Sequence, residues 1–344
     1  MIKIGIIGTG FGAKVHIPGF QKLPEVAVVA LTGKNHDKTK LIAKQYGIPR
    51  AYSNWHDMIR NSEIKAISIA APPYLHFPII QEALKQKKAI LCEKPFCATI
   101  QQASLLEKIA KKTKVITAVD FEFRYVPHFQ ELKKQLAKKT IGKIRYCKVM
   151  WITGGRANEN TPLNWMNYKK FGGGALLNYG SHVIDYLEWL LGPISSVSAD
   201  LKIIKNTKKT ATADDFCQFS ALLQSGVPAQ ATITNVLYGG TGHIIEIYGS
   251  EGTLKLSNHN LFDAVNGFTL AKTNSHDETT TIKIKVQPKA ADGRIYPFSK
   301  LAEDFIKAIE KKETFVPSFT TGVRVHKVMT AIRRSARARK WVKI

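Results

Sequence analysis

Short apolar runs alternate with amphipathic stretches along the first third of the chain. The apolar runs are strand-sized, and the stretches between them carry apolar residues at helical spacing, with capping residues such as Asn35 and Gly47 at their ends. Strands that alternate with helices at this spacing are typical of a parallel sheet built from βαβ units. The expected strands cover residues 2–8, 26–32, 65–71, 89–94 and 114–120, and the expected helices cover 12–23, 35–47, 55–62, 77–88 and 99–113.

The pattern changes from residue 141 onwards, where polar and apolar positions alternate over consecutive strands joined by Gly or Pro turns. These strands cover 142–153, 194–205, 215–224, 229–238, 243–250 and 252–257, with one helix over 180–191 among them. Two further helices, 299–311 and 321–341, close the chain, and the second has an apolar stripe at Val325, Val328, Met329, Ile332 and Ala336. This half indicates a largely antiparallel sheet.

The predicted fold is α/β with two domains, which suits the 344-residue length because a domain typically takes roughly 100–200 residues. Residues 1–120 are expected to form an N-terminal Rossmann domain with a doubly wound parallel sheet. Residues 121–344 are expected to form a C-terminal α/β domain with a large, mostly antiparallel open sheet. The helices predicted over 299–311 and 321–341 could pack back on the Rossmann domain.

Composition places the chain among ordinary globular proteins, with 44% hydrophobic and 22% charged residues. No apolar run approaches the roughly 18–20 residues that a membrane helix needs. The N-terminus runs directly into a predicted strand, so we expect no secretory signal and a cytoplasmic protein. The four cysteines form no C-x-x-C pair, which argues against a zinc site or a disulfide framework, and we expect no bound metal.

Basic residues outnumber acidic ones by 51 to 26, which gives a net charge of +25. Such an excess attracts polyanions. The lysines fall mostly on predicted helix faces, however, and the chain contains no zinc finger, RNP motif or helix-turn-helix. We therefore do not expect nucleic acid to be the main partner. A lysine-rich source proteome or an anionic substrate explains the charge better.

A G-x-G-x-x-A motif follows the first predicted strand and opens the first predicted helix. Gly8 permits the tight turn, Gly10 lets the backbone approach a pyrophosphate, and Ala13 is small enough for close packing of helix on strand. Phe11 and Gly12 complete the turn. The free N–H groups at the start of the helix favour phosphates. In this strand–turn–helix context the motif predicts a dinucleotide site.

The end of the second predicted strand bears on which dinucleotide is bound. An acidic residue there binds the ribose 2′-hydroxyl of NAD, whereas a basic residue accommodates a 2′-phosphate. This chain has Thr32 and Lys34 at the strand end, and the first acid is Asp37, in the next helix. Both Thr32 and Lys34 could hydrogen-bond a phosphate, so NADP is favoured over NAD. The alternative is that Lys34 is an ordinary loop lysine.

Two further loops follow predicted parallel strands, at the edge of the sheet where open α/β folds bind their ligands. Their residues are expected to contact the cofactor: Ala71, Pro72, Pro73 and His76 in the first loop, Glu93 and Lys94 in the second. Lys94 is held between a strand end and Pro95, so it is well placed to project into a cleft and exchange a proton. Lys94 is the candidate catalytic residue, against the alternative of a surface lysine.

A third cluster surrounds three glycines, residues 172–174, just before the helix predicted over 180–191. Glycines allow a close backbone approach to a ligand or to the other domain. His182 and Asp185 are three positions apart on this helix and share a face, so Asp185 could accept a ring N–H of His182 and orient it. With Asn178 one turn earlier, the cluster indicates a site, although a histidine at a helix start is more often structural.

In their order and spacing, the motifs G-x-G-F-G-A, A-P-P-x-x-H, E-K-P and G-G-G-x-L-x-x-x-G-x-H-x-x-D resemble those of the glucose–fructose oxidoreductase / inositol dehydrogenase (Gfo/Idh/MocA) family. The resemblance runs nearly end to end. It implies NAD(P)-dependent oxidation or reduction of a sugar, cyclitol or related carbonyl compound. It also implies a Rossmann domain joined to an α/β domain whose open sheet often forms a homodimer or homotetramer interface.

The resemblance also implies roles for single residues. Lys94 would be the E-K-P lysine, which in relatives transfers a proton and contacts the nicotinamide, and its bond to Pro95 could be cis. His182 would be the histidine of the substrate site. Arg124, in FEFRYVP, and Trp165, in LNWMNY, resemble positions that line the cleft. Substrate specificity is expected in loops such as residues 154–168 and 291–298.

One residue departs from the family pattern, because many active dehydrogenases of the family carry an aspartate where this chain has Asn178. An amide can hydrogen-bond a substrate hydroxyl but cannot exchange a proton at neutral pH. Proton transfer would then rest on Lys94 and His182, with Tyr179 as a remote candidate. Three hypotheses stay open: an NADP-preferring sugar dehydrogenase, a cofactor-sensing binding protein without turnover, and a redox-neutral NAD-dependent glycosidase.

Overall fold

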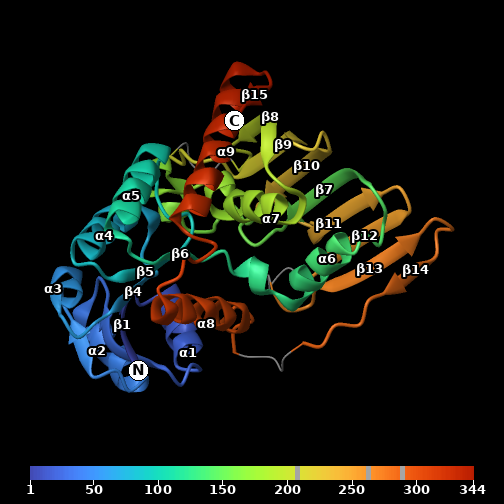
Figure 1. Cartoon of the computed structure of the whole chain (residues 1–344). Helices are drawn as coiled ribbons and strands as arrows, with labels where there is room; N and C mark the ends of the chain where they lie inside the picture. Colours follow the sequence, from blue (N-terminus) through green and yellow to red (C-terminus); the bar gives the residue numbers. More distant parts are fainter. Residues whose placement is uncertain (206–209, 261–264, 287–290) are drawn as a thin grey trace. The chain divides into compact units, whose positions relative to one another are not determined.

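The chain divides into two compact units, each built around its own sheet (Figure 1). The computed structural model describes residues 1–205, 210–260, 265–286 and 291–344. Unit 1 comprises Met1–Glu122 and Ala290–Arg324, and unit 2 comprises Phe123–Lys289 and Val325–Ile344. The predicted α/β fold, with one parallel and one mostly antiparallel sheet, is confirmed.

Unit 1 contains a six-stranded parallel sheet in the order β3-β2-β1-β4-β5-β6. Its strands are β1 Ile2–Ile7, β2 Val26–Thr32, β3 Arg50–Tyr52, β4 Ala66–Ile69, β5 Ala89–Cys92 and β6 Thr117–Val119. All residues of β4 and β5 are buried, as expected for parallel strands covered on both faces. The sequence patterns did not predict β3, because a three-residue edge strand shows no periodicity.

The helices of unit 1 begin with a wide turn, Gly12–His16, that runs into α1 Ile17–Phe20. The others are α2 His36–Gln45, α3 Trp55–Arg60, α4 Pro73–Lys85, α5 Ile100–Thr113 and α8 Ile295–Lys311. Asn35 caps α2, as expected, by accepting the backbone N–H of Lys38. Helix α8 begins four residues before the predicted start, because Pro297 falls in its first turn, where no backbone N–H is needed.

Unit 2 contains a nine-stranded sheet in the order β14-β13-β12-β11-β7-β10-β9-β8-β15. Its strands are β7 Ile144–Ile152, β8 Ile194–Lys202, β9 Phe216–Leu223, β10 Pro228–Thr234, β11 Gly242–Gly249, β12 Gly252–Asn258, β13 Thr269–Asn274, β14 Thr279–Thr281 and β15 Val342–Lys343. Among the described strands of this sheet, only the β7–β10 pair is parallel. The sequence patterns missed β13, β14 and β15: β14 and β15 form the two edges of the sheet, β13 lies next to β14, and few of their side chains are buried.

Three α-helices complete the part of unit 2 that the structure describes: α6 Pro127–Ala137, α7 Ser181–Leu191 and the larger part of α9 Phe319–Ala338. The predicted stripe of α9 is buried from Val325 to Ile332, but Ser335 is fully buried where Ala336 was expected. The Ser335 hydroxyl accepts the Ala199 N–H of β8, which explains its burial. Helix α9 ends at Ala338, before the predicted end, because Arg339 adopts a left-handed conformation.

None of the helices in the described part of the chain is both long enough and apolar enough to cross a membrane.

Candidate functional site

The glycine motif forms a tight turn at the end of β1. Gly8 has a φ of +124°, and a Cβ there would lie 2.3 Å from the carbonyl oxygen of Ala70, so only glycine fits. Gly10 is exposed, and no heavy atom of the described residues lies within 4 Å of the position that its Cβ would take. The turn is therefore closed at Gly8 and open at Gly10, which suits a pyrophosphate approaching the backbone.

The two other positions of the motif pack inwards. Ala13 is buried, and a Cβ on Gly12 would lie 3.2 Å from a methyl group of Ile6, so both positions require small residues. The Phe11 ring is half-exposed and carries the Arg294 guanidinium over its face, 4.6 Å from the centroid. Arg294 itself pairs with Asp292, with contacts of 2.6 and 2.8 Å.

At the end of β2, the structure separates the two residues expected to hold a phosphate. The Thr32 side chain is buried, and its carbonyl oxygen accepts the Gly8 N–H at 2.8 Å. Thr32 therefore contributes to the shape of the glycine turn. Lys34 is exposed, and Asp37 lies in the first turn of α2 with an exposed side chain, 3.9 Å from Lys40.

His76 joins the two loops that follow β4 and β5. Its ring nitrogens lie 2.7 Å from the Ala71 carbonyl oxygen and 3.1 Å from the Pro95 carbonyl oxygen. Burial lowers the pKa of His76, so the ring is neutral and donates one N–H at a time. Because His76 is fully buried, the expectation that it contacts the cofactor is corrected: it holds the loop of Pro72 and Pro73 against the loop that carries Lys94.

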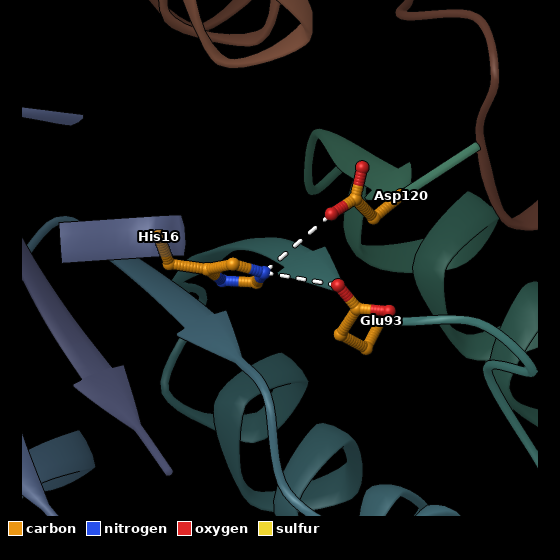
Figure 2. A group of neighbouring side chains, drawn as sticks. All are labelled: His16, Glu93 and Asp120. Carbon is orange, nitrogen blue, oxygen red and sulfur yellow. Dashed lines mark hydrogen bonds and ion pairs between the residues drawn. The ribbon is translucent and has the colours of Figure 1, made fainter. Parts of the chain in front are cut away.

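A buried cluster of His16, Glu93 and Asp120 lies at the same end of the sheet, beside Lys94. The His16 Nε2 atom is 3.0 Å from Glu93 Oε1 and 3.5 Å from Asp120 Oδ2, and Figure 2 shows both carboxylates directed at this nitrogen. The other ring nitrogen of His16 is 2.7 Å from the Ser68 hydroxyl. The Lys94 N–H donates to the second oxygen of Glu93 at 3.2 Å. The cluster therefore fixes the backbone from which the Lys94 side chain projects.

The carboxyl groups near Lys94 differ in charge. Burial and the nearby Glu93 raise the pKa of Asp120 well above its ordinary value, so Asp120 holds its proton more strongly than an exposed aspartate does. Burial acts the same way on Glu93, but the hydrogen bond and charge of His16, with the Lys94 ammonium, outweigh it and lower the pKa of Glu93. Burial and the Glu93 charge raise the pKa of Glu122 to about 7. Lys94 thus lies near one carboxyl whose pKa is lowered and two carboxyls whose pKa is raised.

The same three residues offer a nitrogen and two oxygen atoms within 4.8 Å of one another, which is a donor set for a divalent cation. However, Nε2 of His16 donates its N–H to the Glu93 carboxylate in this contact and so offers no lone pair to a cation, and the Lys94 ammonium already balances charge here. These observations favour a shared proton over a metal ion in this cluster.

Glu122→Gln should flatten the pH dependence of stability. The folded protein keeps a proton on Glu122 up to about pH 7, whereas the unfolded chain releases it near its ordinary value of 4.5. Between these two pKa values the folded protein therefore binds more protons than the unfolded chain does. The free energy of unfolding falls as pH rises through this interval, by up to about 3 kcal/mol. Urea unfolding from about pH 5 to about pH 8 measures this slope. Glu131→Gln is the control, because the pKa of Glu131 is lowered and this carboxyl therefore titrates below the measured pH range.

In unit 2, Asp185 does not have the partner expected from the sequence. Its two carboxylate oxygens accept the Nε and an Nη of Arg124, at 2.9 and 2.7 Å, in a buried bidentate pair. The interpretation that Asp185 orients His182 is therefore corrected. A guanidinium that offers two parallel N–H donors forms a stronger contact than a single imidazole N–H. Arg124, expected in the substrate cleft, is likewise committed to Asp185 and lies over the Trp189 ring.

His182 lies among aromatic rings near the start of α7. Its side chain is buried, with the Phe123 ring edge-on at 4.8 Å and the Trp151 ring at 6.3 Å between centroids. Tyr179 also packs edge-on against Trp151, at 5.1 Å, and its hydroxyl accepts the Asn235 amide at 3.0 Å. Asn178 donates to the Gly174 carbonyl oxygen at 2.8 Å. The structure thus brings Tyr179 and His182 to one aromatic wall.

The three glycines before α7 serve packing within unit 2. A Cβ on Gly173 would lie 2.3 Å from the Met166 carbonyl oxygen, and Gly174 has a φ of +121°. A Cβ on Gly174 would also lie 2.7 Å from an oxygen of Asp214. The close approach expected at this run is therefore to the turn that carries Trp165 and to Asp214. Trp165 is half-buried in that turn, Trp165–Asn167.

An open cavity of about 320 Å³ lies beside the aromatic wall, where β7 and β10 end. Its lining combines aromatic and polar side chains, of which sequence reasoning had singled out only Tyr179. The main lining residues are Trp151, Arg156, Tyr179, Asn235, His243 and Asn258. One signal was present in the sequence, since Arg156 lies in the loop 154–168 in which specificity was expected. The others are scattered over four strands and become neighbours only in the sheet.

Comparison with known proteins assigns both parts of the chain to one family. Residues 2–121 match the oxidoreductase family with an NAD-binding Rossmann fold, and residues 133–344 match its C-terminal alpha/beta domain. The whole chain is 33% identical to a protein described as an uncharacterized oxidoreductase from Synechocystis sp., 96% of which is covered. It is 25% identical to levoglucosan dehydrogenase from Pseudarthrobacter phenanthrenivorans, 98% of which is covered.

The fold has a close counterpart among solved structures. A levoglucosan dehydrogenase in complex with NADH and levoglucosan aligns with a TM-score of 0.90 at 24% identity, covering 100% of this chain and 99% of that one. This likeness concerns the fold.

Proposed function

The chain belongs to the oxidoreductase family with an NAD-binding Rossmann fold, and from this premise we propose that it is an NADP-preferring dehydrogenase or reductase of a sugar-like substrate. The reaction interconverts a CH–OH group and a ketone in a sugar, cyclitol or related compound. The glycine turn, closed at Gly8 and open at Gly10, is the observation that carries the proposal. The relative named levoglucosan dehydrogenase supports a carbohydrate substrate.

Lys94 is the proposed proton-transfer residue. The glycine turn at Gly8 and Gly10 would hold the dinucleotide, whose nicotinamide would supply the hydride chemistry. In oxidation, the Lys94 amine takes the proton of the substrate hydroxyl as the C–H hydride leaves, and in reduction it returns that proton to the oxygen. The contacts of Glu93 and His76 with the Lys94–Pro95 segment hold the loop in place. The neighbouring carboxyls balance the ammonium charge.

The substrate hydroxyls are assigned to polar side chains at the aromatic wall of unit 2. We assign them to His182, Tyr179 and Asn178, with Trp165 as an apolar neighbour. Hydrogen bonds to a polyol orient the reacting carbon without exchanging protons, so an amide at position 178 is compatible with this role. Arg124 and Asp185 have a positioning role: their contact fixes α7, the helix from which His182 projects. Assembly as a homodimer or homotetramer is part of the same proposal, and light scattering measures it.

Titration of the purified protein with NADPH and NADH, followed by nicotinamide fluorescence, tests the proposal, together with a turnover screen over sugars and polyols. Exchangeable NADPH binding with turnover of a sugar or polyol is the expected result. Binding of neither cofactor would overturn the dinucleotide site itself.

A second candidate is a cofactor-sensing protein without turnover, which Asn178 favours because it replaces a proton-exchanging carboxyl. Tight NADPH binding with no turnover of any sugar or polyol would support it. A nicotinamide that copurifies and does not exchange would point instead to a cofactor recycled within each turnover, as in a redox-neutral glycosidase.

Lys34→Ala should weaken NADPH binding about tenfold and leave NADH binding unchanged. An exposed lysine next to a 2′-phosphate contributes a charge-assisted contact of about 1.4 kcal/mol, which corresponds to a factor of ten. NADH has no 2′-phosphate and does not form this contact, so its binding does not change. Lys44→Ala, at the far end of α2 and equally exposed, controls for the general effect of removing positive charge. An equal loss for both cofactors would count against the NADP preference.

A further inference from the structure

The cavity beside the aromatic wall contains one charged side chain, Arg156. Its described lining includes no aspartate or glutamate. The lining also contains His243, whose pKa burial lowers to about 3, so it is neutral. The cavity is therefore a space of about 320 Å³ with aromatic and polar side chains in its walls and a single positive group, at the small end of the range for ligand sites.

Arg156 is held in place without a counter-charge. Its guanidinium donates to the side-chain oxygen of Asn167 at 2.9 Å and to the Pro162 carbonyl oxygen at 3.3 Å, both of which are neutral acceptors. Its backbone N–H donates to the Asn235 carbonyl oxygen at 2.9 Å. Among the described residues, no carboxylate pairs with it. A half-buried guanidinium with a fixed orientation and donors to spare matches the planar oxygens of a carboxylate or a phosphate.

The remaining lining suits hydroxyl groups. His243 stacks on Trp151 at 4.2 Å, and its Nε2 lies 3.0 Å from the Tyr186 hydroxyl. The other ring nitrogen, Nδ1, is buried and has no hydrogen-bond partner in the described part of the chain. A buried polar atom without a partner costs about 1–3 kcal/mol, and a ligand hydroxyl would remove that cost whether Nδ1 is a donor or an acceptor. The Thr153 hydroxyl and the Asn235 amide offer further partners.

This cavity adjoins the residues assigned to the substrate. Trp151 forms one of its walls and lies 5.1 Å from the Tyr179 ring and 6.3 Å from the His182 ring. The distance from Trp151 to these rings is within the length of a single sugar. A substrate at His182 would therefore extend into the cavity towards Arg156.

We propose that this cavity binds the anionic group of the substrate, so that the enzyme acts on a polyol or sugar bearing a carboxylate or phosphate, held by Arg156. The inference rests on the proposed function, because it takes the cavity as part of the same substrate site. The excess of positive charge on the chain supports it, since a field of this sign speeds the approach of anions.

Binding of matched polyols tests the inference. The probes are sorbitol, gluconate and sorbitol 6-phosphate, and the readout is tryptophan fluorescence of the NADPH-loaded protein, since Trp151 lines the cavity. At least one anionic probe should bind about 10–100-fold more tightly than sorbitol, as a charge-assisted contact of about 1.4–2.8 kcal/mol requires. The difference between gluconate and sorbitol 6-phosphate distinguishes a carboxylate from a phosphate.

Two variants identify the residue responsible. Arg156→Gln should abolish the preference for the anionic probe over sorbitol, and Arg156→Lys should restore part of that preference. Arg145→Gln is the matched control, because Arg145 is an exposed arginine at the other end of β7. Equal binding of anionic and neutral probes, no binding of the anionic ones, or an undiminished preference in Arg156→Gln would each overturn the inference.

The failure of the inference and that of the proposed function give different results. Turnover of neutral sugars without any preference for anions would leave the proposed function standing and remove the role of Arg156. An anion preference that depends on Arg156, with no turnover of any probe, would leave the anion site standing and remove the dehydrogenase.

Discussion

Replacing Lys94 with alanine should lower kcat about 10²–10⁴-fold, the usual contribution of a positioned general acid or base. The backbone of Lys94 is fixed by its N–H contact with Glu93 and by the contact of His76 with Pro95. Its ammonium charge helps to lower the pKa of Glu93, and it opposes the burial that raises the pKa of Asp120 and Glu122. An alanine can neither accept the substrate proton nor return it. Steady-state kinetics at saturating substrate measures the loss.

The binding of NADPH should change little in this variant, because the glycine turn that receives the pyrophosphate is formed by other residues. Lys94→Arg should be nearly as inactive as Lys94→Ala, since a guanidinium keeps the charge but does not give up its proton. Lys85→Ala, an exposed lysine at the end of α4, is the control for lost positive charge. A kcat that stays within a factor of three of the original in Lys94→Ala would remove Lys94 from the mechanism.

Asp185→Asn should lower the free energy of unfolding by about 3–5 kcal/mol, the cost of leaving one charge of a buried pair without its partner. The Arg124 and Asp185 side chains are only 10% and 2% exposed. Burial raises the pKa of Asp185 and the charge and hydrogen bonds of Arg124 counter that effect, so the two groups depend on each other. Asparagine has nearly the same size, and the loss therefore reports on charge. Urea unfolding at neutral pH measures it.

A double variant separates the pair from the fold around it. Arg124→Met with Asp185→Leu removes both charges and fills the space with apolar groups, so it should recover most of the stability lost in Asp185→Asn. If Asp185→Asn unfolds within about 1 kcal/mol of the original chain, the pair behaves as a surface ion pair and the burial argument fails. Because His182 and Asp185 both lie on α7, a higher KM in Asp185→Asn would show that the pair also positions the substrate site.

Much of the fold followed from local patterns, because each depends on residues close in the chain. The apolar runs of β1, β2, β4 and β5 indicated buried parallel strands, and these are present in the expected order. Gly8 and Gly10 predicted a turn with one closed and one open glycine, which the geometry shows. Of the strands that local patterns missed, β3, β14 and β15 are short and lie at sheet edges, and β13, next to β14, has few buried side chains.

The partners of charged side chains could not be predicted in this way. Asp185 and His182 share a helix face, and that proximity suggested a pair, but Arg124 reaches Asp185 across 61 positions of sequence. His16 lies in the helical turn after β1, and it meets Glu93, 77 positions away, and Asp120 only because β1, β4, β5 and β6 are successive neighbours in the sheet. The sequence signal for Asp120 was its place directly after β6, which matches the place of Glu93 directly after β5.

The features of the chain thus fall into two groups, according to how far apart in the sequence the residues that form them lie. Local spacing was sufficient for the order of the elements, the dinucleotide turn and the loop that carries Lys94, because a turn or a helix face is settled within about four residues. The charge states around Lys94, the commitment of Arg124 to Asp185 and the cavity at Arg156 required the folded chain. Burial and pairing depend on which distant side chains fill the same space, and no local pattern encodes that.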